Sequence, residues 1–123
     1  MACLVIVSGE QAGIYFQLTK RTLTGGRDPA REIQIVDAKV SRKHFQIRCA
    51  EDHYLVVEMH SLNGVQVNGE RIDGEQVLHD GDEILVGGTM LQFYEDDNPD
   101  RTNALNIYRQ SDRRLREDRT ITD

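Results

Sequence analysis

Four basic side chains within a short stretch of the sequence could together bind an anionic group. They are Arg27, Lys39, Arg42 and Lys43, in a segment that holds few acidic residues. Arginine binds phosphate well because its planar guanidinium donates to two oxygens at once. The whole chain carries a formal net charge of −6, so it repels long nucleic acids. The grouping predicts either a small phosphate-binding pocket or a solvated basic face, and no nucleic-acid partner.

Catalytic and metal-binding patterns are missing from the sequence. The four histidines, His44, His53, His60 and His79, are never three or four residues apart, and none adjoins a cysteine. The chain has no Gly-x-Ser-x-Gly elbow and no glycine-rich phosphate loop that opens a helix. We therefore expect no metal, no cofactor and no enzymatic activity.

The composition is that of one globular domain in a reducing compartment. The chain has 123 residues, of which 38% are hydrophobic and 29% charged, and this is enough for one ordinary core. It lacks an apolar run of the roughly 18 to 20 residues that cross a bilayer, and its start lacks the basic lead of a secretory signal. Cys3 and Cys49 are expected to be free thiols. We expect a cytoplasmic protein without membrane contact.

Short apolar segments separated by turns predict a sheet protein up to residue 97. The expected strands are residues 3–7, 14–18, 21–24, 33–35, 44–49, 54–59, 65–67, 83–86 and 89–94, with two more near Ile72 and Val77. Gly25-Gly26 is expected to end the third strand. Asn68-Gly69 suits a two-residue hairpin because both residues tolerate positive φ. Such a series of strands predicts an all-β, antiparallel sandwich over residues 1–97.

The sequence changes character after residue 97. Asn98-Pro99 is a typical helix start, with Asn as the N-cap and Pro at the first helical position. A narrow apolar stripe follows at three- and four-residue steps, and it consists of Ala104, Leu105, Tyr108, Ser111 and Leu115. So polar a helix is marginal in water unless it docks on a surface. We predict that residues 98–123 form an arginine-rich appendage, helical at first and then disordered.

Five short patterns occur in a fixed order between the expected strands. They are Gly26-Arg27, Ser41-Arg42-Lys43-His44-Phe45, Ser61-Leu62-Asn63-Gly64, Asn68-Gly69, and Gly81-Asp82 with Gly87 behind it. Each pattern alone is common, but the set is specific at these spacings. Over about residues 3–95 the sequence resembles the forkhead-associated (FHA) domain family.

This resemblance implies a sandwich of about eleven short strands, whose loops at one end bind phosphothreonine peptides. It implies that Arg27 and Ser41 hold the phosphate, with Arg42 beside them and Lys43 behind. Asn63 is implied to bind the peptide backbone next to the phosphothreonine. A phosphothreonine brings about −1.5 to −2 charges and three acceptor oxygens, which an Arg fork and a Ser hydroxyl can satisfy.

Further residues of the pattern are expected to support the loops rather than the ligand. They are Gly26, His44, Ser61, Gly64, Asn68 and Gly69. Leu62 departs from the family pattern, because a hydroxyl residue usually stands there and adds a phosphate contact. Either Arg42 or Lys43 replaces that contact, or phosphate is bound more weakly. A domain that has kept the fold and lost the ligand is a further alternative.

These features predict a phosphothreonine-dependent protein-binding adaptor in Ser/Thr kinase signalling, either a monomer or a weak dimer through the tail. Its partners would be a protein that carries phosphothreonine and the upstream kinase. Two other functions fit the sequence. One is a docking or scaffold domain of FHA type that binds without phosphate. The other is the sensor part of a larger effector protein that continues beyond Asp123.

A threonine near the end of the sequence resembles a ligand for such a site. Asp123 stands three residues after Thr120, and many FHA domains favour an acidic or aliphatic residue at that offset. We predict that a kinase phosphorylates Thr120 and that the tail then docks on an FHA site, its own or a neighbour's. A polar terminus without this role is the alternative.

Overall fold

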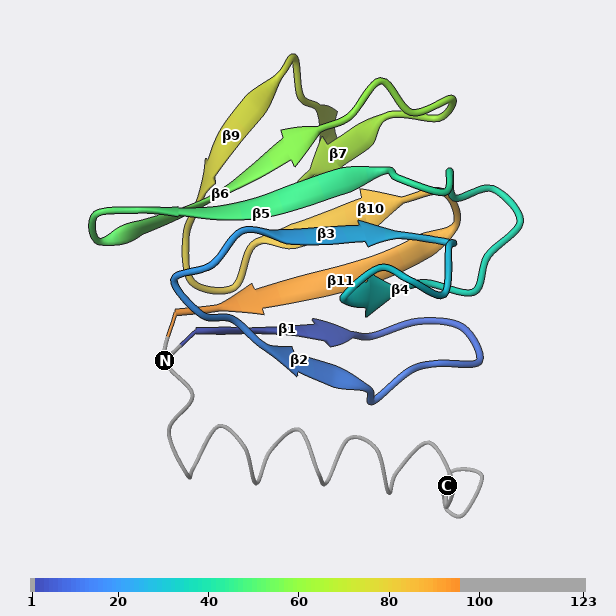
Figure 1. Cartoon of the computed structure of the whole chain (residues 1–123), viewed down its shortest axis with the longest axis horizontal. Coiled ribbons are helices and arrows are strands. Elements are labelled where there is room, and N and C mark those ends of the chain that lie inside the picture. The colour runs from blue at the N-terminus through green and yellow to red at the C-terminus, as the bar shows by residue number, and fades with distance from the viewer. Residues whose placement is uncertain (1, 96–123) are drawn as a thin grey trace.

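The computed structural model describes residues 2–95, and these form two sheets of short strands (Figure 1). The six-stranded sheet contains β1 (Cys3–Ile6), β2 (Tyr15–Gln17), β7 (Val65–Val67), β8 (Glu70–Arg71), β10 (Glu83–Val86) and β11 (Thr89–Tyr94). The five-stranded sheet contains β3 (Leu23–Gly26), β4 (Ile33–Gln34), β5 (Phe45–Ala50), β6 (His53–Glu58) and β9 (Glu75–Leu78). The predicted all-β sandwich is confirmed.

The order of the strands brings distant parts of the chain together. The six-stranded sheet runs β2-β1-β11-β10-β7-β8 and the five-stranded sheet runs β4-β3-β5-β6-β9. Cys3 lies opposite Tyr94, so the first and last strands lie side by side (Figure 1). The pairing of β3 with β4 is parallel, which departs from the antiparallel expectation. A parallel pair is possible without a long crossover here because β4 has only two residues.

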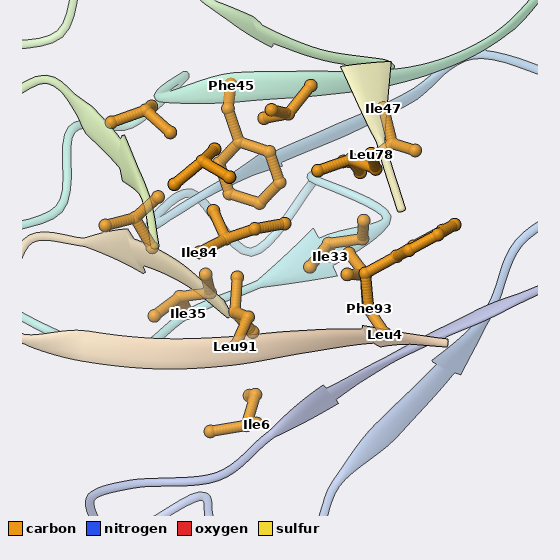
Figure 2. Close-up of a cluster of buried hydrophobic side chains, with 14 of the residues drawn as sticks. Leu4, Ile6, Ile33, Ile35, Phe45, Ile47, Leu78, Ile84, Leu91 and Phe93 are labelled. Atoms are coloured by element: carbon orange, nitrogen blue, oxygen red, sulfur yellow. The ribbon is translucent and has the colours of Figure 1, made fainter. Parts of the chain in front are cut away.

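Alternation of side chains along the strands builds one core between the two sheets. Phe45 and Ile47 of β5 are buried, whereas Gln46 between them is only partly buried. Figure 2 shows Phe45 pointing from β5 into the space between the sheets, with Ile84 and Leu91 coming from the opposite sheet. The core therefore ties β5, the strand after the expected phosphate-binding loop, to β10 and β11.

Gly25 and Gly26 continue β3 instead of ending it, so the prediction of a strand end was wrong. A Cβ at Gly25 would collide with the Phe45 ring, and a Cβ at Gly26 would collide with the backbone carbonyl group of Arg42. The two glycines therefore allow a ring and a loop backbone to approach β3 closely. Their role is close packing within a strand rather than a turn.

Residues 98–123 lie outside the described part of the chain, and so do the predictions made for the tail and for a boundary after residue 97.

Residues 2–95 contain no helix with the length and apolar character that crossing a bilayer requires. Cys3 is buried, Cys49 is partly buried, and the two are not joined in a disulfide.

Replacing Gly25 by Ala is expected to lower the free energy of unfolding by about 1 to 3 kcal/mol, because the added methyl overpacks the Phe45 ring. Urea denaturation followed by circular dichroism measures this change. Gly88→Ala is the control, since the nearest atom to its Cβ would be Asp37 Oδ2 at 3.3 Å. A loss of stability as large in Gly88→Ala as in Gly25→Ala would contradict the packing argument.

Candidate functional site

The loop between β4 and β5 is the centre on which the expected phosphate-binding residues converge. Arg27 follows β3 directly, and its backbone N–H donates to the Ser41 carbonyl oxygen at 2.9 Å. The Arg27 side chain donates through Nε to the Val40 carbonyl oxygen at 3.0 Å. Arg27 is exposed, yet these two bonds hold it against the loop. The loops that follow β3, β4 and β6 lie at the right-hand end of the sandwich in Figure 1.

The loop between β6 and β7 is joined to the same stretch of backbone. Asn63 donates through Nδ2 to the Lys39 carbonyl oxygen at 2.7 Å. The backbone N–H of Leu62 donates to Ser41 Oγ at 3.2 Å. The β4–β5 loop therefore gathers one expected binding residue from each of three loops.

Each of these three side chains keeps hydrogen-bonding groups for a ligand. Arg27 engages Val40 through Nε, and its two terminal amino groups supply further donors. Ser41 Oγ accepts from the backbone, which leaves its hydroxyl proton free to donate elsewhere. Asn63 donates through Nδ2, so its Oδ1 remains an acceptor. The set offers donors for an anion and both kinds of group for a peptide backbone.

His44 links two of the loops from the inside of the sandwich. Its side chain is completely buried. Nδ1 accepts from the Ser41 N–H at 3.0 Å, and Nε2 lies 2.6 Å from the Gly64 carbonyl oxygen. Because Nδ1 accepts, the ring proton must be on Nε2, which donates to Gly64. One neutral tautomer thus joins the loop before β5 to the loop before β7.

The loop from His60 to Gly64 has a shape that requires left-handed backbone at both ends. The φ angle is 54° at His60 and 72° at Gly64, and the buried Ser61 hydroxyl accepts from the Gly64 N–H at 3.0 Å. Arg71 covers Gly64 from outside, since a Cβ at Gly64 would lie 2.6 Å from the Arg71 Nε. The same guanidinium lies 3.6 Å from the Glu58 carboxylate. Gly64 is therefore enclosed on two sides.

Asn68 and Gly69 form the two-residue hairpin between β7 and β8, and this prediction is confirmed. Their φ angles of 53° and 87° fit the type I′ turn that such hairpins prefer. The Asn68 side chain also braces the neighbouring turn. Its Nδ2 donates to Asp82 Oδ1 at 2.9 Å, and its Oδ1 accepts from the Glu83 N–H at 3.0 Å. Asn68 therefore locks two turns together.

Two acidic residues beside the site are engaged in loop structure. Asp37 accepts from the backbone N–H of Lys39 at 2.9 Å, from the N–H of Gly88 at 2.9 Å and from Thr89 Oγ1 at 2.8 Å. These bonds hold the pKa of Asp37 below its ordinary value, and the bond from the Lys39 N–H contributes most. Asp28 accepts a backbone N–H of its own loop at 3.0 Å. Their negative charge is thus directed toward backbone amides.

The rim of the site carries two cations and one apolar side chain. Arg42 and Lys43 are both exposed, and Leu62 is 87% exposed.

Thr120 lies outside the described residues, so its phosphorylation stays a prediction.

A sequence profile of the FHA domain family matches residues 23–87. The chain belongs to the FHA family. The matched range begins with β3 and ends just after β10. It contains Arg27, Ser41 and Asn63, so all three loops that meet at the candidate site are part of the FHA domain.

A curated bacterial protein has a similar sequence. The oxoglutarate dehydrogenase inhibitor of Corynebacterium efficiens is 44% identical over 92 residues, which make up 75% of this chain and 64% of that protein. The similarity thus spans less than two thirds of the length of this curated relative.

Two solved structures resemble the FHA fold described here. One comes from a study of phosphothreonine-dependent FHA domain interactions, with a TM-score of 0.69 and 28% identity over 76% of this chain and 94% of that one. The other is Mycobacterium tuberculosis EmbR in complex with a low-affinity phosphopeptide. It has a TM-score of 0.72 and 29% identity over 79% of this chain and 25% of that one.

Two residues beside the candidate site, Asp37 and Arg71, were not identified from the sequence, and Lys39 was identified only for its basic side chain. Lys39 contributes its carbonyl oxygen, which every residue type has, so no sequence signal exists for it. Arg71 reaches Gly64 from β8, and nothing in the sequence indicates that contact. Asp37 could have been found, because an Asp in a loop often accepts a hydrogen bond from the backbone N–H two residues later and so forms an Asx-turn. Here that N–H belongs to Lys39. Residues 2–95 hold no cluster of three or more His, Cys, Asp or Glu that could bind a metal ion.

The stability that Asp37 contributes is expected to disappear in acid. Its pKa is lower in the folded than in the unfolded chain, so the contribution is complete above the ordinary value of 3.8 and is lost as the pH falls through the folded pKa. Urea midpoints measured between about pH 6 and pH 2 should therefore fall less steeply in Asp37→Asn than in the native chain. Asp52→Asn, at an exposed turn, is the control. Identical slopes for the native chain and Asp37→Asn would rule this contribution out.

Proposed function

We propose that this FHA domain binds phosphothreonine peptides through Arg27, Ser41 and Asn63. The observation that carries the proposal is that all three residues are hydrogen-bonded into one cluster around the backbone of residues 39–41, each from a different loop. Similar FHA structures studied with phosphopeptides or for phosphothreonine dependence give it further support.

In the proposed complex the phosphate meets Arg27 and Ser41. The terminal amino groups of Arg27 donate to two phosphate oxygens, and the Ser41 hydroxyl donates to a third. Asn63 accepts a peptide N–H through Oδ1. Because Nδ2 of Asn63 is already bonded to Lys39, the carboxamide is oriented before the ligand arrives. Less conformational entropy is then lost on binding.

The rim residues set the expected strength of binding. Arg42 and Lys43 add positive charge next to the phosphate. Leu62 offers no hydroxyl, so its side chain provides an apolar surface for the peptide instead. Few side chains of an extended peptide are buried at such a site, so we expect a Kd of about 1 μM, or roughly −8 kcal/mol.

In this proposal the protein is a cytoplasmic adaptor without catalysis of its own. A Ser/Thr kinase creates the phosphothreonine, and the FHA domain, residues 1–97, then binds the modified protein. An FHA-containing inhibitor among the relatives supports a regulatory role of this kind. The tail after residue 97 is proposed to be an arginine-rich helical appendage.

Arg27→Ala is expected to weaken binding of a phosphothreonine peptide by about 30-fold or more, because removing one partner of a desolvated charge pair costs roughly 2 to 5 kcal/mol. Isothermal titration calorimetry with a peptide selected from a phosphothreonine library measures this. Arg48→Ala is the control, since Arg48 is an exposed arginine on β5 that bonds to Gln46.

The unphosphorylated peptide separates the adaptor from a docking domain. We expect no measurable binding without the phosphate. Equal binding of both peptide forms, or unchanged affinity in an Arg27→Ala variant with a native circular dichroism spectrum, would favour phosphate-independent docking.

A phosphothreonine peptide is expected to bind about tenfold or more tightly than the matched phosphoserine peptide. The γ-methyl restricts the rotamer of the phosphate-bearing side chain, and one methyl in a fitted apolar site contributes about 1 to 3 kcal/mol. Competition between the two peptides for the native domain, followed by fluorescence anisotropy, gives the ratio. A ratio near one would contradict selective recognition of threonine.

A further inference from the structure

Two backbone carbonyl groups hold binding side chains of the candidate site in place. The Arg27 side chain donates to the Val40 carbonyl oxygen at 3.0 Å, and the Asn63 side chain donates to the Lys39 carbonyl oxygen at 2.7 Å. The directions of Arg27 and Asn63 therefore depend on where the backbone of residues 39 and 40 lies. Whatever fixes this short stretch of backbone also fixes the site.

Asp37 holds the N–H groups of the same two residues. Its Oδ1 accepts from the Lys39 N–H at 2.9 Å, and its backbone carbonyl oxygen accepts from the Val40 N–H at 2.9 Å. Lys39 and Val40 thus each donate to Asp37 and each accept from one binding side chain. Asp37 is thereby linked to Arg27 and to Asn63 through a single residue in each case.

The other carboxylate oxygen of Asp37 anchors the loop to the opposite sheet. Oδ2 accepts from the Gly88 N–H at 2.9 Å and from Thr89 Oγ1 at 2.8 Å. Gly88 lies in the turn between β10 and β11, and Thr89 is the first residue of β11. This turn lies at the same end of the sandwich as the loops of the candidate site (Figure 1). Because β10 and β11 carry the core residues Ile84 and Leu91, the anchor is rigid.

The turn between β10 and β11 also packs directly against the anchored stretch. A Cβ at Gly87 would lie 2.8 Å from Val40 Cγ2 and 3.0 Å from the Lys39 carbonyl carbon. Thr89 is only 8% exposed, so its hydroxyl lies beneath the surface that a peptide could touch. An effect of this hydroxyl on peptide binding would therefore be transmitted through its bond to Asp37.

A carboxylate close to a phosphate site is unfavourable in charge, because like charges repel. The Asp37 side chain nevertheless suits its place, since its two oxygens accept from three donors, the Lys39 N–H, the Gly88 N–H and the Thr89 hydroxyl. An Asn of the same shape has a single acceptor oxygen and cannot serve both sides of the loop. The negative charge at this position is therefore offset by the geometry that it maintains.

We propose that Asp37 is a positioning residue of the FHA site. It fixes the Lys39 and Val40 carbonyl groups against the turn between β10 and β11, and these groups orient Asn63 and Arg27 before a peptide binds. Side chains that are oriented in advance lose less conformational entropy when the ligand is bound. The inference rests on the proposed function, because it concerns the same site, although it can fail while that function stands.

Asp37→Asn in the full chain is expected to weaken binding of the library-selected phosphothreonine peptide by about fivefold or more, because Asn loses either the anchor or the bond to Lys39. Asp28→Asn is the matched control, since Asp28 Oδ1 accepts the Ala30 N–H at 3.0 Å and an Asn oxygen can still do so. Each substitution removes one negative charge, which alone favours an anionic ligand. Calorimetry should therefore show weaker binding in Asp37→Asn, and equal or tighter binding in Asp28→Asn. Equal or tighter binding in both variants would overturn the proposal.

Thr89 tests the anchor from the other end of the hydrogen bond. Thr89→Val keeps the shape of the side chain and removes the hydroxyl, so we expect peptide binding to weaken by about threefold. Thr89→Ser keeps the hydroxyl and should bind the peptide as the native chain does. Equal affinities of the two Thr89 variants would overturn the proposal, because the hydroxyl would then make no difference.

The side-chain amide of Asn63 provides a readout in the free protein. In NMR spectra of the full chain, its Nδ2 proton resonances should move toward those of a freely solvated amide in Asp37→Asn and Thr89→Val. They should keep their positions in Asp28→Asn and Thr89→Ser. Unmoved resonances in the first two variants would overturn the proposal, even if peptide binding weakens. Moved resonances in a protein whose native chain binds no phosphopeptide would support the positioning by Asp37 and contradict the proposed function alone.

Discussion

The close approach of β3 to the loop before β5 is the constraint on which the candidate site depends. It exists because residue 26 has no side chain, so the Arg42 backbone can lie directly against Gly26. At this separation the Arg27 N–H reaches the Ser41 carbonyl oxygen, and the Arg27 side chain reaches Val40. Any larger side chain at residue 26 would push Arg27 and Ser41 apart, and so would disrupt the proposed phosphate site.

Electrostatics explain how an acidic chain can present a site for an anion. The formal net charge is −6, yet the carboxylates of Asp28 and Asp37 accept hydrogen bonds from backbone amides. Arg27, Arg42 and Lys43 remain exposed at the surface. The position of charges, more than their sum, therefore decides which ligand the loops can accept. Steering at long range is weak in such a protein, and selectivity comes from contacts made after encounter.

The sequence was a good guide to whatever depends on local pattern. Alternating apolar residues predicted the strands, and Asn68-Gly69 predicted the hairpin, because both signals lie within a few residues. Gly25 was misjudged because the reason for it is the ring of Phe45 on another strand.

Much of the support around the binding residues was equally hidden. The Lys39 carbonyl and the Arg71 guanidinium act through contacts that the sequence does not encode locally. The FHA motifs predict that Arg27, Ser41 and Asn63 face a ligand, and this stays a prediction. The bonds that orient Asn63 and set the proton of His44 on Nε2 became visible only in three dimensions.

The pairing of β1 with β11 has a consequence for how the protein is made. Cys3–Ile6 is synthesised before the other described strands of the domain, whereas its antiparallel partner, Thr89–Tyr94, is synthesised after all of them. Closing so long a loop carries an entropic cost that non-local contacts repay only late in folding. The six-stranded sheet is therefore completed only after synthesis of the whole domain. Until then, the apolar side chains of β1 stay without their partner strand, which leaves the partly synthesised domain open to aggregation.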